Sequence, residues 1–243
     1  MGTVTNRFLE GVSWEGTTDA LAISGAEVHI FRINISQSIN RLAYFETLLS
    51  SDEKLRAGKY RQQKDTHRFI VSRGAQRIIL GRYLNHPPAE LEFVLGDNKK
   101  PYLMSRTGEA IRYNLSHSGD WIVLAAAAMP VGADVEQIDH AFPFQDILAD
   151  NFSGEEAKFI GTSPERFFML WTRKEAILKA TGQGLGDHLS LTPAIDGQHS
   201  LDASLTGAQK NWQLNSFELA DGYIATIVVE GDGQRFMFFE ADL

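Results

Sequence analysis

The sequence contains no cysteine among its 243 residues. This absence excludes disulfide bonds, thiolate catalysis and a zinc site built on cysteine, and it fits a reducing compartment, so we expect a cytoplasmic protein. Long apolar runs are also missing, since none approaches the ~18 residues that a membrane-spanning helix needs. No basic region followed by an apolar core marks a signal peptide. We therefore expect no membrane partner.

Positive charge is in short supply as well. The 23 lysines and arginines are outnumbered by 31 aspartates and glutamates, which leaves a net charge of −8. Such a balance argues against bulk binding of nucleic acid, and we expect none. The apolar share of 43% is ordinary for a globular protein, and a chain of this length holds one large domain or two small ones, each with its own core.

The most informative stretch runs from Ser163 to Leu185. Ser163 followed by Pro164 is typical of a helix start, because the hydroxyl caps free N–H groups and the proline ring holds φ near the helical value. A run of alternating glycines from Gly182 ends the helix. Helical spacing places a set of apolar residues on one stripe, namely Phe167, Leu170, Trp171, Ile177 and Leu178.

Three charged residues of this helix lie in or beside the apolar stripe. Lys174 falls inside it, while Glu175 and Lys179 stand together on its shoulder, one turn apart. One interpretation is a lysine that extends its ammonium group to solvent beside an ordinary i,i+4 ion pair. The other interpretation is a functional site.

Further carboxylates support the second interpretation. Asp134 and Glu136 are two residues apart in a strand-like run, so their side chains share a face. Together with Glu175 they offer oxygen ligands suited to Mg²⁺ or Mn²⁺. The alternative is that each carboxylate pairs with a nearby arginine or lysine. Crowded carboxylates repel one another unless a cation or a proton neutralises them.

The remaining elements form a repeating order. We predict helices over 40–49, from 51 towards 64 and over 65–84, and strands over 27–36, 131–136 and 234–240. Hairpins are predicted over 111–128 and 211–230, whereas 1–24, 142–159 and 197–207 have no regular pattern. Gly74 costs about 1 kcal/mol in a helix interior, which predicts a close packing contact. A helix followed by a hairpin occurs twice, as a weak repeat.

Three motifs occur in order along the chain. They are Ser116-His117-Ser118, the G-x-D-x-E pattern that holds Asp134 and Glu136, and W-x-x-KEA-x-x-K from Trp171 to Lys179. Over about 54–185 the chain resembles the 4′-phosphopantetheinyl transferases of the surfactin-synthetase-activating type. The resemblance implies an α+β fold of two similar halves related by a pseudo-twofold axis. We place the halves at 1–129 and 130–243, with the active site in the cleft between them.

The resemblance also implies the reaction. A magnesium-dependent enzyme, with manganese as a possible substitute, would transfer the 4′-phosphopantetheine arm of coenzyme A to a serine hydroxyl of an apo acyl or peptidyl carrier protein, releasing 3′,5′-ADP. Whether the carrier serves fatty-acid, polyketide or nonribosomal peptide biosynthesis stays open. Two complete halves predict a monomer.

Residue roles follow from the same resemblance. Metal ligation falls to Asp134, Glu136 and Glu175, and catalysis to Glu175, Lys179 and His117. Glu175 would accept the serine proton, directly or through a bound water, and Lys179 would neutralise phosphates and protonate the leaving group. The coenzyme A contacts would be Lys54, Arg68, Lys100, Pro101, Ser116, His117, Asp134, Lys174 and Lys179.

The chain departs from the family pattern at two positions. Lys99 replaces a glycine before Lys100, and Ala57 stands where a second basic residue is expected; the neighbouring Arg56 is the candidate to replace that residue. Two other functions use the same features: a metal-dependent phosphohydrolase, and a binding protein without catalysis. For the carrier, we expect an apolar docking patch within 142–159, although the same residues suit a small core. The apolar residues of this stretch are Phe142, Phe144, Ile147, Leu148 and Phe152.

Overall fold

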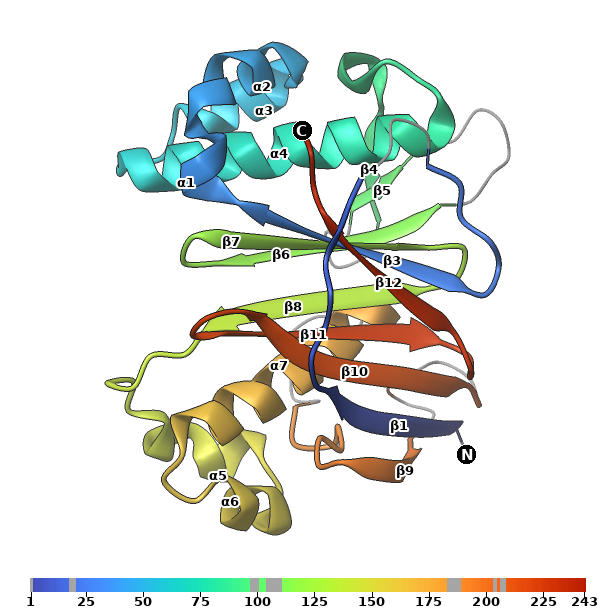
Figure 1. The fold of residues 1–243 in the computed structure, drawn as a ribbon. Coiled ribbons are helices and arrows are strands. Elements are labelled where there is room, and N and C mark those ends of the chain that lie inside the picture. The colour runs from blue at the N-terminus through green and yellow to red at the C-terminus, as the bar shows by residue number, and fades with distance from the viewer. Residues whose placement is uncertain are drawn as a thin grey trace.

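The computed structural model describes residues 2–17, 21–96, 101–103, 111–182, 189–202, 205 and 209–243. It confirms an α+β fold of two halves. Two five-stranded sheets pack face to face, and each carries one long helix on its outer side, as Figure 1 shows. Helix α4 covers one sheet and helix α7 covers the other, so that the two halves share one architecture.

The sheets exchange their terminal strands. The first sheet has the order β2 (Glu15–Gly16), β12 (Arg235–Glu240), β3 (Glu27–Asn34), β7 (Trp121–Ala127) and β6 (Arg112–Ser118). The second has the order β8 (Val131–Gln137), β11 (Tyr223–Glu230), β10 (Asn211–Ala220), β1 (Gly2–Leu9) and β9 (Gly197–Leu201). Strand β1 runs parallel to β10, and β12 runs parallel to β3 (Figure 1). A single cut at residue 130 therefore does not separate the two sheets, and the ranges 1–129 and 130–243 remain a prediction.

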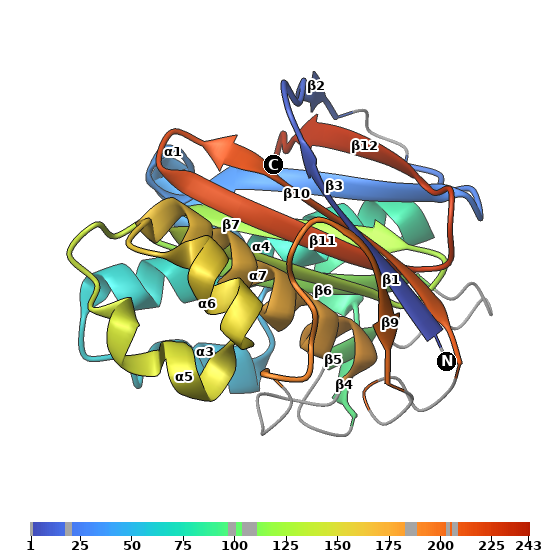
Figure 2. The same ribbon diagram turned by 90° about the horizontal axis from the view of Figure 1, so that it is seen from below.

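The helices and smaller elements complete the two halves. In the first half they are α1 (Ile35–Ser38), η1 (Ile39–Arg41), α2 (Leu42–Leu48), α3 (Ser51–Ala57), α4 (Gln63–Leu84), η2 (Pro88–Glu90) and the hairpin β4 (Phe93–Leu95) with β5 (Pro101–Leu103). In the second half they are η4 (Phe144–Ile147), α5 (Leu148–Asn151), α6 (Gly154–Ile160) and α7 (Pro164–Thr181). Seen from below, α5 and α6 lie beside α7 (Figure 2).

Local signals predicted several of these elements correctly. The Ser163 hydroxyl accepts a hydrogen bond from the Arg166 N–H, and Gly182 ends α7 in the left-handed region with φ of 75°. A capping box joins Ser50 to Glu53 at the start of α3. Gly74 packs against Phe45, where a Cβ atom would come within 2.5 Å of the phenylalanine ring. The packing contact predicted at this glycine is thus confirmed.

Other predictions were wrong. Residues 2–9 form β1 and residues 197–201 form β9, in two stretches (1–24 and 197–207) for which no regular pattern was found in the sequence. The basic helix that begins at Ser51 ends at Ala57, and α4 starts at Gln63. Both missed strands pair with each other, and β1 also pairs with β10, some two hundred residues away, so no local pattern reports the pairing.

The apolar residues of 142–159 mostly form a core. Phe144 and Phe152 are buried, and the Phe144 ring stacks on Phe167 with centroids 4.8 Å apart. Ile147 and Leu148 are half-buried, and only Phe142 is substantially exposed, at 39%. The stretch folds into η4, α5 and α6 because these side chains pack on α7. The expected apolar docking patch is therefore corrected to a small core.

Candidate functional site

A cavity of about 580 Å³ lies between the two halves. The first half contributes its wall of α4, β5 and β6, with Arg68, Pro101, Ser116 and His117 among the lining residues. The second half contributes β8 and α7, with Asp134, Glu136, Glu175 and Lys179. The structure therefore brings together eight of the residues that sequence analysis selected, from five separate segments.

The close approach of α7 to β8 positions the acidic side of the cavity. Gly132 lies under the helix, where a Cβ atom would stand 2.1 Å from the Ala176 carbonyl oxygen and 2.5 Å from the Ala180 nitrogen. Any larger residue would push the helix away. Because Glu175 and Lys179 are one turn apart, both then face the strand that carries Asp134.

Hydrogen bonds join β6 to β8 across the cavity wall. The Ser116 hydroxyl donates to Asp134 Oδ1 at 2.8 Å, and the Ser118 hydroxyl donates to Glu136 Oε2 at 2.8 Å. Lys179 Nζ lies 2.6 Å from Asp134 Oδ1 and 3.1 Å from Ser116 Oγ. The two halves are thus linked through polar residues of the predicted motifs.

The carboxylates are hard to ionise together. Burial, followed by the charge of Asp134, raises the pKa of Glu136 to about 7. Burial and the charges of Asp134 and Glu136 likewise raise the pKa of Glu175 to about 7, against an opposing effect of Lys179. Burial also raises the pKa of Asp134, which is only 2% exposed. The cavity therefore concentrates negative charge that lacks full compensation.

This donor set fits a divalent cation. Asp134 Oδ2 is buried and has no hydrogen-bond partner among the described residues, so it has a free lone pair in an acidic site. Carboxylate oxygens are the ligands that magnesium and manganese prefer. Within the part of the chain that the structure describes, no three acidic or histidine side chains already surround one point. Lys179 instead contacts Asp134, and a cation would have to share that carboxylate with it.

We expect Glu136→Gln to stabilise the metal-free protein at pH 8. The folded pKa of about 7 exceeds the unfolded value of 4.5, so the folded state binds more protons between these values and loses stability as pH rises through them. Glutamine removes this cost, on the order of 1–3 kcal/mol, and the gain should disappear below pH 4.5. Urea unfolding at pH 8 and pH 4 in the presence of chelator measures it.

The matched control for this change is Glu218→Gln, at an exposed position of β10, and it should leave stability unchanged at both pH values. A Glu136→Gln protein that is less stable than the wild type at pH 8 would contradict the crowding of negative charge.

The first half contributes arginines to the same cavity. Arg56, Arg68 and Arg73 line it, and Arg68 Nη2 also forms an ion pair with Asp65 at 2.8 Å. Burial and the nearby Arg68 lower the pKa of His117, so its imidazole is neutral at pH 7 and can both donate and accept a hydrogen bond. One cavity is therefore lined by arginines of α3 and α4 and by carboxylates of β8 and α7.

Several residues of the cavity wall were not singled out from the sequence. Arg73, Ser72 and Gln76 line it from α4, and Tyr60 and Tyr113 add aromatic surface. Arg68, Ser72 and Gln76 repeat at intervals of four residues, so the helical period would have placed them on the face of Arg68. Tyr113 lies only three residues before Ser116, in the strand that carries the serine-histidine motif.

Three of the predicted coenzyme A contacts are not among the residues that line the cavity: Lys174 and Lys54 are described by the structure, and Lys100 is not. Lys174 is fully buried, and its Nζ forms an ion pair with Glu156 at 2.9 Å, so the structure replaces its predicted phosphate contact with an internal one. Lys54 is exposed on α3 and is not among the residues that line the cavity. Lys100 lies outside the described residues, and the roles of both lysines remain predictions.

Comparison with known proteins agrees with the motifs. Residues 36–129 match the family described as "4′-phosphopantetheinyl transferase, N-terminal", and 130–228 match the "4′-phosphopantetheinyl transferase superfamily". The chain is 30% identical over 238 residues to the 4′-phosphopantetheinyl transferase HetI of Nostoc sp., covering 93% of this chain and 98% of that protein.

Bacillus relatives extend the comparison. Identity is 33% with the 4′-phosphopantetheinyl transferase psf-1 of Bacillus pumilus, over 69% of this chain and 72% of that protein. Identity is 24% with the 4′-phosphopantetheinyl transferase Sfp of Bacillus subtilis, over 74% of this chain and 81% of that protein. The chain belongs to the 4′-phosphopantetheinyl transferase superfamily, as the three motifs indicated. It is an enzyme of the phosphopantetheinyl transferase class.

Within the described residues, no helix combines the length and apolar character needed to cross a membrane.

Proposed function

We propose that this enzyme transfers the 4′-phosphopantetheine arm of coenzyme A to the serine hydroxyl of an apo carrier protein and releases 3′,5′-ADP. The observation that carries the proposal is the charge layout of the cavity. Arg56, Arg68 and Arg73 suit the phosphate of the nucleotide end. Strand β8 and helix α7 contribute the carboxylates and Lys179, which suit a metal-neutralised diphosphate.

We further propose that the reaction depends on magnesium, with manganese as a substitute. Asp134, Glu136 and Glu175 would hold the ion, since burial and their mutual repulsion raise the pKa of Glu136 and of Glu175 to about 7, and one Asp134 oxygen has no partner among the described residues. The bound ion would supply neutralisation of the diphosphate charge. Mutual repulsion of this kind is relieved by a cation.

The chain's own residues then divide the remaining work. Glu175 is the proton acceptor for the serine hydroxyl, because its carboxylate lines the cavity and is ionised once a cation balances the neighbouring charges. Lys179 holds a phosphate oxygen and donates a proton to the leaving group. The neutral His117 hydrogen-bonds to a phosphate oxygen from the facing strand. The Ser116 hydroxyl has one proton, which it donates to Asp134, so its contact with coenzyme A requires that this proton turn to a phosphate oxygen.

Product analysis with and without a carrier separates transfer from hydrolysis. The enzyme is incubated with coenzyme A and magnesium, and 3′,5′-ADP is followed by chromatography. We expect nucleotide to accumulate only when an apo carrier is present, in equal amount to the modified carrier. Nucleotide release without a carrier would favour the phosphohydrolase instead, and its absence in both arms would favour a binding protein.

Arg68→Ala should weaken coenzyme A binding about ten-fold. A hydrogen bond to a charged phosphate contributes on the order of 1.5–3 kcal/mol, and part of it is offset because Arg68 already pairs with Asp65. Calorimetry with coenzyme A and with dephospho-coenzyme A measures the loss. The dephospho compound should bind both proteins equally, if Arg68 contacts the 3′-phosphate.

Arg166→Ala is the control for this experiment, since Arg166 is exposed on α7 and is not among the residues of the cavity wall. Equal weakening of coenzyme A and its dephospho form by Arg68→Ala would contradict the assigned phosphate. The carrier class, a monomeric state and a cytoplasmic location remain predictions.

A further inference from the structure

Lys174, in the middle of helix α7, is a charged residue without solvent contact. It is fully buried, and its Nζ donates to the carbonyl oxygens of Leu189 at 2.8 Å and Thr192 at 2.6 Å. The third partner is Glu156, at 2.9 Å. An ammonium group has three N–H donors, so these three acceptors account for all of them. Lys174 is not among the residues that line the cavity.

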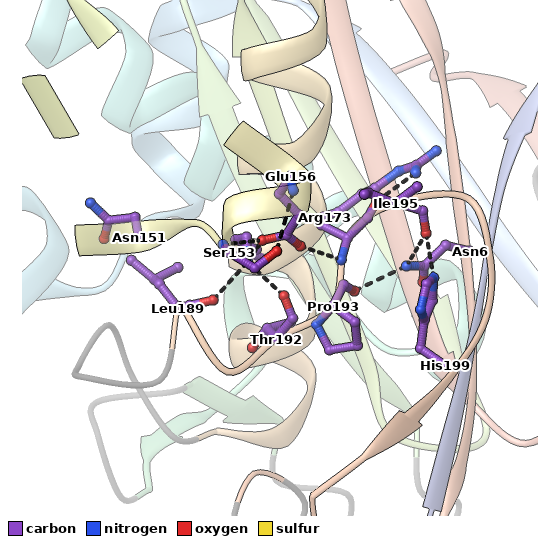
Figure 3. A network of polar contacts seen from close by, with 12 residues as sticks. Asn6, Asn151, Ser153, Glu156, Arg173, Leu189, Thr192, Pro193, Ile195 and His199 are labelled. Atoms are coloured by element: carbon purple, nitrogen blue, oxygen red, sulfur yellow. Dashed lines mark hydrogen bonds and ion pairs between the residues drawn. The ribbon is translucent and has the colours of Figure 1, made fainter. Parts of the chain in front are cut away.

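Glu156 gathers three separate segments around this lysine. It is only 3% exposed. One carboxylate oxygen accepts the Ser153 N–H at the start of α6 and faces Lys174, while the other accepts the Ala194 N–H at 2.8 Å. Figure 3 shows Glu156 between Ser153 and the chain that follows Leu189. A single buried carboxylate thus connects α6, α7 and the segment 189–196.

Neighbouring residues hold the same segment from other directions. Arg173, also fully buried, donates from Nη1 to the Ala194 carbonyl oxygen at 2.7 Å and from Nε to the Ser216 hydroxyl on β10. The Asn6 amide of β1 donates to the carbonyl oxygens of Pro193 and Ile195, each at 3.0 Å (Figure 3). The segment 189–196 lies outside the strands, since β9 begins at Gly197, and these side chains hold it in place.

A buried ion pair of this kind is an inefficient way to stabilise a fold. Removing two charges from water offsets much of their attraction, and an apolar pair of similar volume is often as stable. What an ion pair provides is direction, because each hydrogen bond admits a narrow range of geometry. Lys174 immediately precedes Glu175, so the rotation of α7 that satisfies Lys174 also determines where Glu175 and Lys179 lie over β8.

We propose that Lys174 and Glu156 form a positioning pair that holds α7 at the rotation in which Glu175 and Lys179 face Asp134. The inference rests on the proposed function of those residues, but assigns Lys174 and Glu156 no contact with coenzyme A, metal or carrier. Breaking the pair leaves the cavity wall chemically intact and displaces it.

The test compares Lys174→Met, Glu156→Gln and the double variant with Lys158→Met, an exposed position of α6. Methionine keeps the length of lysine, and glutamine keeps the shape of glutamate. We expect kcat for transfer to fall roughly 10- to 100-fold, because small displacements of catalytic groups have effects of this size. KM for coenzyme A should change by less than about threefold, and the double variant should be no slower than Lys174→Met, because both changes break one interaction.

Hydrogen exchange read by mass spectrometry adds a readout that needs no activity. The amides of 174–181 and 189–196 should exchange roughly ten-fold faster or more in the variants, with α4 unchanged. If Lys174→Met does not fold, Glu156→Gln alone decides. Unchanged exchange or unchanged kcat would overturn the positioning pair, and a raised KM with normal kcat would restore the phosphate contact. If the wild-type enzyme modifies no carrier, the proposed function is overturned instead. The hydrogen-exchange comparison would still test the positioning pair in that case, because it needs no activity.

Discussion

Glu175→Gln should lower the rate of phosphopantetheine transfer at least about a thousand-fold while the fold persists. A positioned base contributes roughly 10²- to 10⁴-fold to a rate, and this carboxylate is also a proposed metal ligand. Glutamine has nearly the same shape but can neither accept the serine proton nor balance a cation. Steady-state transfer to an apo carrier at saturating coenzyme A measures the effect, and circular dichroism monitors the fold.

The matched control is Glu165→Gln on the same helix, whose carboxylate is mostly exposed and lies away from the cavity wall. It should transfer at the wild-type rate. Glu175→Gln should also unfold at a higher temperature than the wild type at pH 8 without metal, because it removes a carboxylate whose pKa burial raises to about 7. A Glu175→Gln enzyme within ten-fold of the wild-type rate would contradict both roles of this residue.

Gly132→Ala should damage stability and activity together. The new methyl group would meet the Ala176 oxygen at 2.1 Å and the Ala180 nitrogen at 2.5 Å, and both are backbone atoms that cannot move without the helix. Overpacking in a core costs about 1–3 kcal/mol, and we expect the upper end here. Because α7 must retreat from β8, transfer should fall roughly 100-fold in the protein that remains folded.

Gly154→Ala provides a matched control, because a Cβ atom at Gly154 meets no atom within 4 Å. This change should leave activity unaltered and raise stability slightly, by up to about 1 kcal/mol. Urea unfolding and transfer assays on both variants give the comparison. Normal stability and normal activity in Gly132→Ala would show that the contact between α7 and β8 is looser than the structure describes.

How much of the fold the sequence predicted depends on how local each signal is. Helix α7 was found because Ser163, Pro164 and Gly182 act on the backbone beside them. Strands β1 and β9 were missed because their partners lie far along the chain, and β1 crosses to the sheet of the other half. Pairing between distant segments depends on tertiary context that a local pattern does not carry.

The site was predicted better where its residues belong to short motifs. Asp134, Ser116 and Lys179 were selected separately, and their hydrogen bonds join the two halves. Lys174 was assigned to phosphate from the family resemblance, and its partner Glu156 is invisible without the fold. Phe144 likewise suggested a docking patch until α7 covered it. Burial separates these cases, and burial is a property of the assembled fold.

Intact mass spectrometry of the carrier is the direct test of phosphopantetheine transfer by this enzyme. The enzyme is incubated with coenzyme A, magnesium and several apo carrier proteins, each beside a variant whose acceptor serine is alanine. We expect that at least one carrier gains the mass of one phosphopantetheine group, that its alanine variant gains none, and that Glu175→Gln enzyme produces no gain. Unmodified carriers in every arm, with coenzyme A intact or merely hydrolysed, would contradict it.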